Sequence, residues 1–220
     1  MMKNKEAKSL VADVFCKIRS AKSVNDFDEI VDTNPILKKN KFDPSKYPDL
    51  EMNISTNDIA NLKDSAILSD DNKMLPLEGS LKLSPLEKLL YSVLWKNGDL
   101  GKEKHIVDGV LAAENEKDDS SKDSGLVFYQ YGKHLANREE PIVDQHTIRA
   151  FLLFKNMDSL DSEITKIRKK STLKSGELSA FRSWIQSSEI GGVDVQFHID
   201  KVLFSLGKSI KITKRNEKST

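Results

Sequence analysis

The sequence predicts an all-α protein, and two observations lead to that prediction. Apolar residues recur three and four residues apart, the spacing of one helical face, in segments spread over most of the 220 residues. No set of alternating strand patterns joined by hairpin turns occurs, although residues 193–199 could be mistaken for one strand. We therefore expect a multi-helix globular domain preceded by a short N-terminal helical segment.

The N-terminal segment, residues 1–83, is expected to hold short helices and a long irregular connection. Cys16 lies within the first helical pattern and is expected to be a small buried residue. Ser23 and Asp26 have the spacing of a capping box, which predicts the start of a second helix. The rest of the segment loses the helical pattern, apart from a short helix expected at residues 56–63.

The main helical domain is predicted over residues 84–213. Its first helix begins with Ser84 as the N-cap, Pro85 as the first helical residue and Glu87 as the partner in a capping box. The apolar faces of this helix and of four later helices are Leu86, Leu89, Leu90, Val93 and Leu94; Ile106, Val107, Val110 and Leu111; Val127, Phe128, Tyr131 and Leu135; Leu178, Phe181, Trp184 and Ile185; and Val195, Ile199, Val202, Leu206 and Ile210. Trp95 and Trp184 lie on such faces and are expected in the core.

Two segments are expected to lie in solvent. Residues 114–124 contain five acidic residues, two lysines and no apolar residue, which predicts a solvated and mobile loop. Residues 214–220 are expected to form a basic tail.

The composition narrows the classes of function. A formal net charge of +1 provides no overall attraction to nucleic acid or membranes, so such binding would depend on local patches. The single cysteine excludes an internal disulfide and a CxxC metal site, and the four histidines are dispersed, so we expect neither a metal nor a cofactor. No apolar run approaches the roughly 18–20 residues that span a bilayer, and we expect a cytoplasmic protein without a membrane partner.

The densest polar cluster is Asp144, Gln145, His146 and Arg149, which follows Gly132-Lys133-His134. Asp144 is a good N-cap for the next helix, and Val143 and Ile148 have the spacing of a hydrophobic staple. Capping alone accounts for Asp144, but it does not explain why the other three polar residues occupy the same turns. The cluster is therefore the candidate site.

The stretch YQYGKHLANREEPIVDQHTIRAF resembles a segment of the helix-hairpin-helix DNA glycosylases of the endonuclease III type. In that family a Gly-Lys or Gly-Arg helix precedes two apolar residues and then Asp-Thr-His, an apolar residue, any residue and Arg. The resemblance covers residues 84–154. It implies a helix-hairpin-helix glycosylase-like fold and a flipped base. It also implies that Asp144 is the catalytic residue, meeting the positive charge that develops on the sugar or activating the attacking water.

The resemblance further implies that His146 and Arg149 match the family's following histidine and arginine. With Gln145 they would line the site, and Lys133 and His134 would lie nearby. Lys133 is closer to Asp144 than the family's lyase lysine, and one cysteine cannot hold an iron–sulfur cluster, so a monofunctional hydrolase is expected. The family's glycine-rich hairpin is represented by Gly132 only.

A basic run over residues 165–174 supplies Arg168, Lys169 and Lys170 as candidate contacts to DNA phosphates. Two other functions fit the residues. The first is a non-enzymatic helical module that binds a protein partner or nucleic acid. The second is an RNA-acting or nuclease-like toxin whose dispersed histidines serve as acid and base.

Overall fold

The computed structural model describes residues 2–43, 45, 53–75, 84–114, 124–187 and 193–213. Within these residues the chain is helical, with an isolated antiparallel bridge between Leu68 and Met74 and no longer strand, so the all-α prediction is confirmed. The helices of the described residues are α1 (Asn4–Ser20), α2 (Val24–Asp32), α3 (Pro35–Lys38), α4 (Thr56–Asp64), α5 (Pro85–Asn97), α6 (Glu103–Glu114), α7 (Leu126–Ala136), α8 (Gln145–Lys155), α9 (Asp161–Lys169), α10 (Ser175–Ser187) and α11 (Val193–Ser209). None of them is both long enough and apolar enough to cross a membrane.

The chain forms two compact units. The first unit is built from Met1–Leu50 and Pro141–Thr220, and the second is the intervening segment Glu51–Glu140. These boundaries differ from the sequence-based division into residues 1–83, 84–213 and 214–220, because the N-terminal helices pack with the C-terminal ones. The tail at 214–220 and most of the acidic loop lie outside the described residues.

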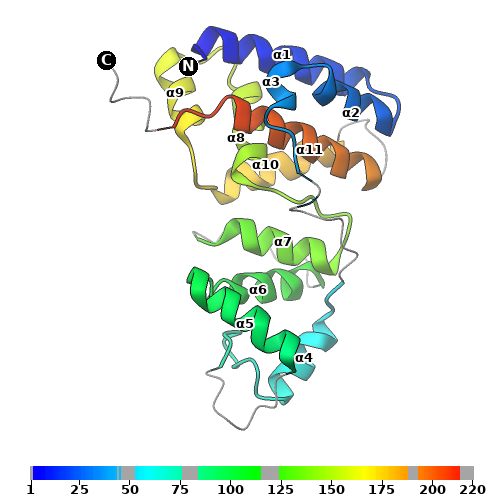
Figure 1. Cartoon of the computed structure of the whole chain (residues 1–220), viewed down its shortest axis with the longest axis vertical. Coiled ribbons are helices and arrows are strands. Elements are labelled where there is room, and N and C mark those ends of the chain that lie inside the picture. The colour runs from blue at the N-terminus through cyan, green and yellow to red at the C-terminus, as the bar shows by residue number, and fades with distance from the viewer. Residues whose placement is uncertain are drawn as a thin grey trace. The chain divides into compact units, whose positions relative to one another are not determined.

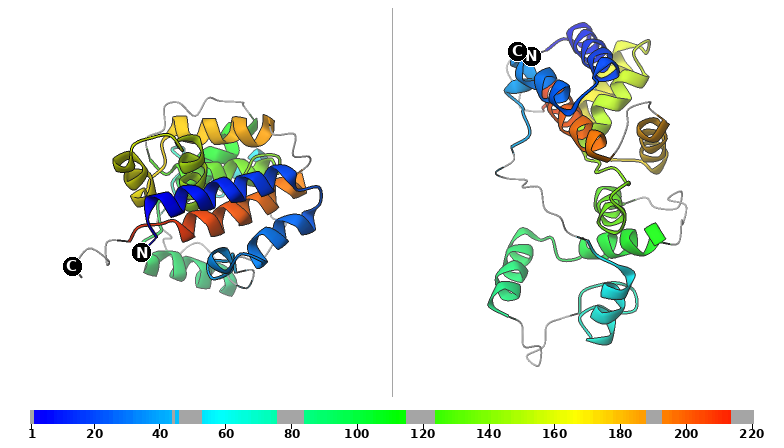
Figure 2. Two further views of the ribbon diagram at one scale, coloured as in Figure 1. Left: turned by 90° about the horizontal axis from the view of Figure 1, so that it is seen from above. Right: turned by 90° about the vertical axis from the view of Figure 1, so that its right-hand side faces the viewer.

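The first unit is organised around α8 and α11. Helix α11 packs against α8, α1, α2 and α3, while α8 also contacts α1, α9 and α10 (Figure 1). Seen from above, α1 and α11 lie side by side (Figure 2). The aromatic part of this core includes Phe15 stacked on Phe154 with ring centroids 4.0 Å apart, and Phe151 in an edge contact with Phe181. Trp184 contacts Phe15, Phe151 and Phe181, in agreement with its expected place in the core.

Helices α8 and α11 meet backbone to backbone at Gly207. A Cβ atom added to Gly207 would overlap the carbonyl group of His146, so only glycine allows this approach. The contact brings the first turn of α8 directly against α11. It fixes the distance between the two helices beside the candidate site.

The second unit is organised around α6 and α7. Gly109 and Gly132 face each other where these helices cross, and a Cβ at either would overlap a backbone carbonyl of the other helix. Gly132, the only glycine of the proposed hairpin, therefore has a helix-packing role. The buried cluster beneath α4 contains Ile59, Leu68, Val107, Val110 and Leu135.

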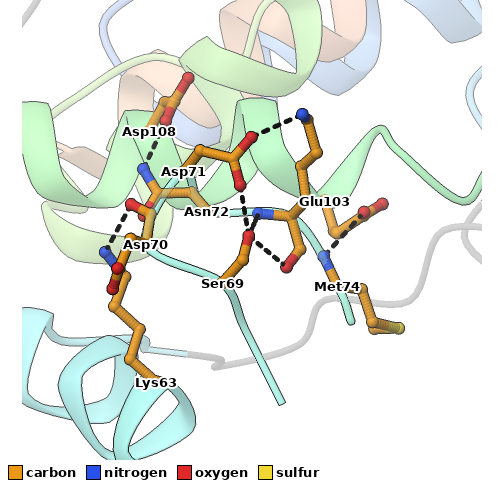
Figure 3. Close-up of polar contacts among 9 residues, drawn as sticks. Lys63, Ser69, Asp70, Asp71, Asn72, Met74, Glu103 and Asp108 are labelled. Carbon is orange, nitrogen blue, oxygen red and sulfur yellow. Dashed lines mark hydrogen bonds and ion pairs between the residues drawn. The ribbon is translucent and has the colours of Figure 1, made fainter. Parts of the chain in front are cut away.

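The turn around Asn72, which follows α4, is held to α6 by polar contacts (Figure 3). Asn72 adopts a positive φ of 65° and donates from Nδ2 to Asp108 Oδ1 at 2.8 Å. The backbone N–H of Met74 donates to Glu103 Oε1 at 3.4 Å. Asp108 and Glu103 therefore support this turn.

Helix α5 forms as predicted, with the Ser84–Glu87 capping box, but its apolar face is not buried. The backbone N–H of Ser84 donates to Glu87 Oε2 at 2.6 Å, and the N–H of Glu87 donates back to Ser84 Oγ at 3.3 Å. The five apolar residues of its face are exposed: Leu86 by 63%, Leu89 by 61%, Leu90 by 55%, Val93 by 50% and Leu94 by 38%. The side chain of Trp95 lies outside the described residues. Cys16, expected to be buried, is exposed on α1 because it points away from the face formed by Val11, Val14, Phe15 and Ile18.

Candidate functional site around Asp144

Asp144 caps α8, so the predicted N-cap role is confirmed. Its backbone is extended, and its Oδ1 accepts hydrogen bonds from the N–H groups of His146 at 2.6 Å and Thr147 at 2.7 Å. Val143 and Ile148, the expected staple pair, are both buried. The second carboxylate oxygen, Oδ2, accepts no hydrogen bond from the part of the chain that the structure describes. A half-buried carboxylate thus has one oxygen fixed by the helix and one available.

Thr147 links Asp144 to a second carboxyl group. The Thr147 side chain is fully buried, and its hydroxyl donates to Oδ1 of Asp200, on α11, at 2.7 Å. One residue therefore holds Asp144 through its N–H and Asp200 through its O–H. Burial, and secondly the charge of Asp144, raise the pKa of Asp200 to about 8, against the opposing effects of the Thr147 hydrogen bond and Lys201.

Sequence reasoning missed Asp200. It lies more than fifty residues after Asp144, on a helix whose pattern indicates only an apolar face. Only the packing of α11 on α8 brings the two carboxyl groups to the same threonine. No local spacing signals that arrangement.

Arg149 is a fully buried support of the first turn of α8, rather than a side chain on the site surface. Its Nη1 donates to the Gly207 carbonyl at 3.1 Å and to His146 Nδ1 at 2.8 Å, and its Nη2 donates to the Lys170 carbonyl. Burial lowers the pKa of Arg149 to about 10, which still leaves it charged at neutral pH. The guanidinium fork ties α8 to α11 and to the chain after α9.

His146 is held as an acceptor at Nδ1. Burial is the main cause that lowers the pKa of His146; the charge of Asp144 opposes it, and Arg149, Lys211 and Lys208 add to it. A neutral ring that accepts from Arg149 at Nδ1 carries its proton on Nε2. The ring also meets Phe204 edge-on, with centroids 5.1 Å apart.

Lysines of α11 and of the residues that follow it surround this site. Lys208 is exposed, with Nζ 5.5 Å from the ring centroid of Phe204, and Lys201 lies over Phe197 at 4.0 Å. Lys208 and Lys211 are close enough to His146 to act on its pKa, and Lys201 acts on Asp200. Positive charge here thus comes from Lys201 and Lys208 of α11 and from Lys211 just after it.

Within the expected basic run, the position of Arg168 differs from the expectation. Arg168 is buried, and its guanidinium donates to the carbonyls of Ile210 and Met2 at 2.8 Å each and to Asn4 Oδ1 at 2.7 Å. The Nζ of Lys170 pairs with Glu177 at 2.9 Å, while Lys169 is exposed. The burial of Arg168 contradicts its expected contact with DNA, because its donors are used to join the two ends of the first unit.

The other expected residues divide between the two units. Gln145, half-buried, begins α8 beside Asp144. Lys133 and His134 belong to α7 of the second unit, where both are buried. The Nδ1 of His134 lies 2.7 Å from the Glu140 carbonyl, and Arg138 Nη1 donates to its Nε2 at 3.0 Å. Lys133 Nζ lies 5.5 Å from the ring centroid of Tyr129.

Comparisons with known proteins identify no relative: no family model, no curated protein and no solved structure matches the chain. Over the described residues, no group of three or more histidine, cysteine or acidic side chains is placed to hold a metal ion. Fold and site define an all-α protein in which a helix-capping carboxylate, a second carboxyl group and several lysines lie together.

Proposed function

We propose that the protein is a monofunctional hydrolase of N-glycosidic bonds in DNA, resembling the helix-hairpin-helix glycosylases, with Asp144 facing the sugar of a flipped nucleotide. The observation that carries the proposal is the divided role of the Asp144 carboxylate. One oxygen is fixed by two backbone N–H groups, and the other accepts no hydrogen bond from the described chain. Such a group is already oriented, so it needs little reorganisation when a positive charge develops beside it.

The chemistry requires little else from the protein. The bond between the sugar carbon and the base nitrogen breaks, and its electron pair leaves with the base. The sugar becomes positively charged, and water supplies the oxygen that replaces the base. Asp144 stabilises that positive charge and accepts the proton that the water loses, while the base nitrogen takes up a proton.

The surrounding cations support a polyanionic substrate. Lys208 and Lys211 lie near His146 at the same end of α8, although the whole chain carries a net charge of only +1. Lysines in such a place would neutralise phosphates on either side of the reacting nucleotide. Binding should therefore weaken steeply as the salt concentration rises.

The test compares base release by the wild-type protein and by Asp144→Asn on duplexes with mismatched, alkylated, oxidised and deaminated bases. Asparagine caps a helix about as well as aspartate, so this variant removes the charge and keeps the cap. We expect a loss of about 10²-fold or more in single-turnover rate, the scale of a removed transition-state contact. Equal rates in the two proteins, or no release of any base by the wild type, would contradict the proposal.

A matched variant separates catalysis from folding. Asp144→Ser also keeps an N-cap hydroxyl but has no negative charge. Both substitutions should change the free energy of unfolding by no more than an ordinary exchange of N-cap residues does, roughly 1 kcal/mol. If activity falls only in proportion to lost stability, Asp144 is a cap and nothing more.

A second candidate, a helical module that binds protein, is favoured by the exposed apolar face of α5. The partner that fits it is a second copy of the chain, because an antiparallel pair of α5 helices would bring Glu87 of one copy to Lys96 of the other. Sedimentation velocity should then show a concentration-dependent dimer that Leu90→Lys abolishes. A wild-type protein that stays monomeric would remove this candidate.

A further inference from the structure

We propose that Asp200 is a positioning residue of this site, kept in its neutral form beside Asp144 by the packing of α11 on α8. This role rests on the hydrolase proposed above, but the protonation of Asp200 can be tested without any activity. Asp200 was not suggested by the sequence and is not needed to cap α8. Its position is the feature that requires an explanation.

The geometry of the pair is set by Thr147. Its N–H donates to Asp144 Oδ1 and its hydroxyl donates to Asp200 Oδ1, each at 2.7 Å. Thr147 is fully buried, so neither hydrogen bond is readily exchanged for one to water. The two acids are therefore held on either side of one rigid residue.

The carboxyl groups cannot relieve their repulsion by moving apart. Helices α8 and α11 are in backbone contact at Gly207, and Arg149 donates across the same junction to the Gly207 carbonyl at 3.1 Å. Two negative charges held by the same threonine are unfavourable, and a proton on one of them removes the conflict.

The two acids differ in their surroundings. Asp144 receives two backbone N–H groups at the start of α8. Asp200 receives a single hydroxyl hydrogen bond, and burial and the charge of Asp144 raise the pKa of Asp200 to about 8. Asp144 and Lys201 are the charged groups that act on Asp200, whereas His198 of α11 faces Asp28 of α2 at 3.9 Å.

The neutral form of Asp200 has a consequence for substrate binding. With Asp200 neutral, the site presents one negative charge, which suits a sugar that becomes positive between two phosphates. When Asp200 ionises, a second negative charge lies beside the lysines and opposes the approach of the phosphates. The affinity for DNA should fall across that ionisation, and Asp200 acts on the reaction through Thr147 and Asp144.

The experiment follows carboxyl carbons by ¹³C NMR in the full chain as the pH is raised from about 4 to about 10. We expect one aspartate to titrate at alkaline pH in the wild type and to be missing in Asp200→Asn. In Asp144→Asn the same signal should titrate at a pH lower by about one unit, because a like charge has been removed. In Thr147→Val it should move to higher pH, because the hydrogen bond that favours the charged form is lost.

Asp13→Asn is the matched control, since Asp13 pairs with Lys17 on the exposed side of α1. It should leave the alkaline signal unchanged, and circular dichroism establishes that each variant is folded. An Asp200 signal that is unaffected by Asp144→Asn, or the absence of an alkaline carboxyl titration, overturns the inference whatever the enzyme assay shows. If the alkaline Asp200 signal responds to Asp144→Asn but no base is released, the inference about Asp200 stands and the proposed hydrolase does not.

Discussion

Replacing Asp200 by asparagine is expected to increase the free energy of unfolding at neutral pH. Asparagine keeps the shape of the side chain and an oxygen that can accept from the Thr147 hydroxyl at the position now occupied by Asp200 Oδ1. It removes the free-energy cost of an ionised carboxyl group at a position that favours the protonated form. A stabilising substitution at a half-buried acid is an unusual outcome, so it is a sensitive test of the electrostatics.

The magnitude follows from the pKa of Asp200, raised from 3.8 to about 8 in the folded chain. Between these values the folded chain holds a proton that the unfolded chain has released, so stability decreases with rising pH by about 1.4 kcal/mol per unit. The stabilising contribution is complete below the unfolded value and is lost as the pH rises through the folded value. At pH 7 the loss approaches about 4 kcal/mol, and because Asp200 is partly exposed we expect the asparagine variant to recover roughly half of that.

The assay is urea unfolding of both proteins, followed by circular dichroism at a series of pH values between about 4 and about 8.5. The difference in unfolding free energy should be near zero at the acidic end and grow toward pH 8. The free energies of unfolding of the two proteins must depend equally on urea concentration for this comparison, because equal slopes indicate that the same surface is exposed on unfolding. A difference that is constant with pH, or a variant less stable than the wild type at pH 7, would refute this account of Asp200.

Three further predictions concern the packing. Gly207→Ala should destabilise the protein by about 2 kcal/mol or more, because helices α8 and α11 must separate. Gly176→Ala, where an added Cβ meets no atom within 4 Å, should be neutral or slightly stabilising. Equal unfolding midpoints for the two variants would contradict this prediction. Arg149→Lys should cost about 2–3 kcal/mol in urea unfolding, because lysine cannot reproduce the buried fork, and a change below about 0.5 kcal/mol would show that the fork is not needed. Leu90→Ser should leave the stability of the monomer almost unchanged, while Leu178→Ser, at a fully buried position, should unfold it; thermal melts at low concentration distinguish the two.

Local signals in the sequence were sufficient to predict the helices and the N-cap at Asp144. The capping boxes at Ser23 and Ser84 and the N-cap at Asp144 depend on residues within one turn, and all three form as predicted. The apolar face of α8 is likewise buried, from Ile148 to Leu153. Elements of this kind can be predicted because their hydrogen bonds join near neighbours in the chain.

The partners of the charged groups could not be predicted in the same way. Arg149 and Arg168 are expected at the surface on composition alone, yet each is buried because distant backbone carbonyls accept its hydrogen bonds. The pairing of Asp200 with Thr147 depends on the same long-range packing. The leucines of α5 also show this limit of local patterns. Their helical spacing predicts the helix, but it does not indicate which residues, if any, pack against its apolar face.

The order of the two units along the chain has a consequence for biosynthesis. The second unit, Glu51–Glu140, is complete in one stretch of sequence, whereas α1 and α2 need α8 and α11 to cover their apolar faces. About 160 residues separate the end of α2 from the start of α11, which at about 5–20 residues per second is on the order of ten to thirty seconds of translation. The second unit can therefore fold while translation continues and the apolar faces of α1 and α2 are still uncovered. During this interval the nascent chain is most exposed to aggregation or to binding by a chaperone.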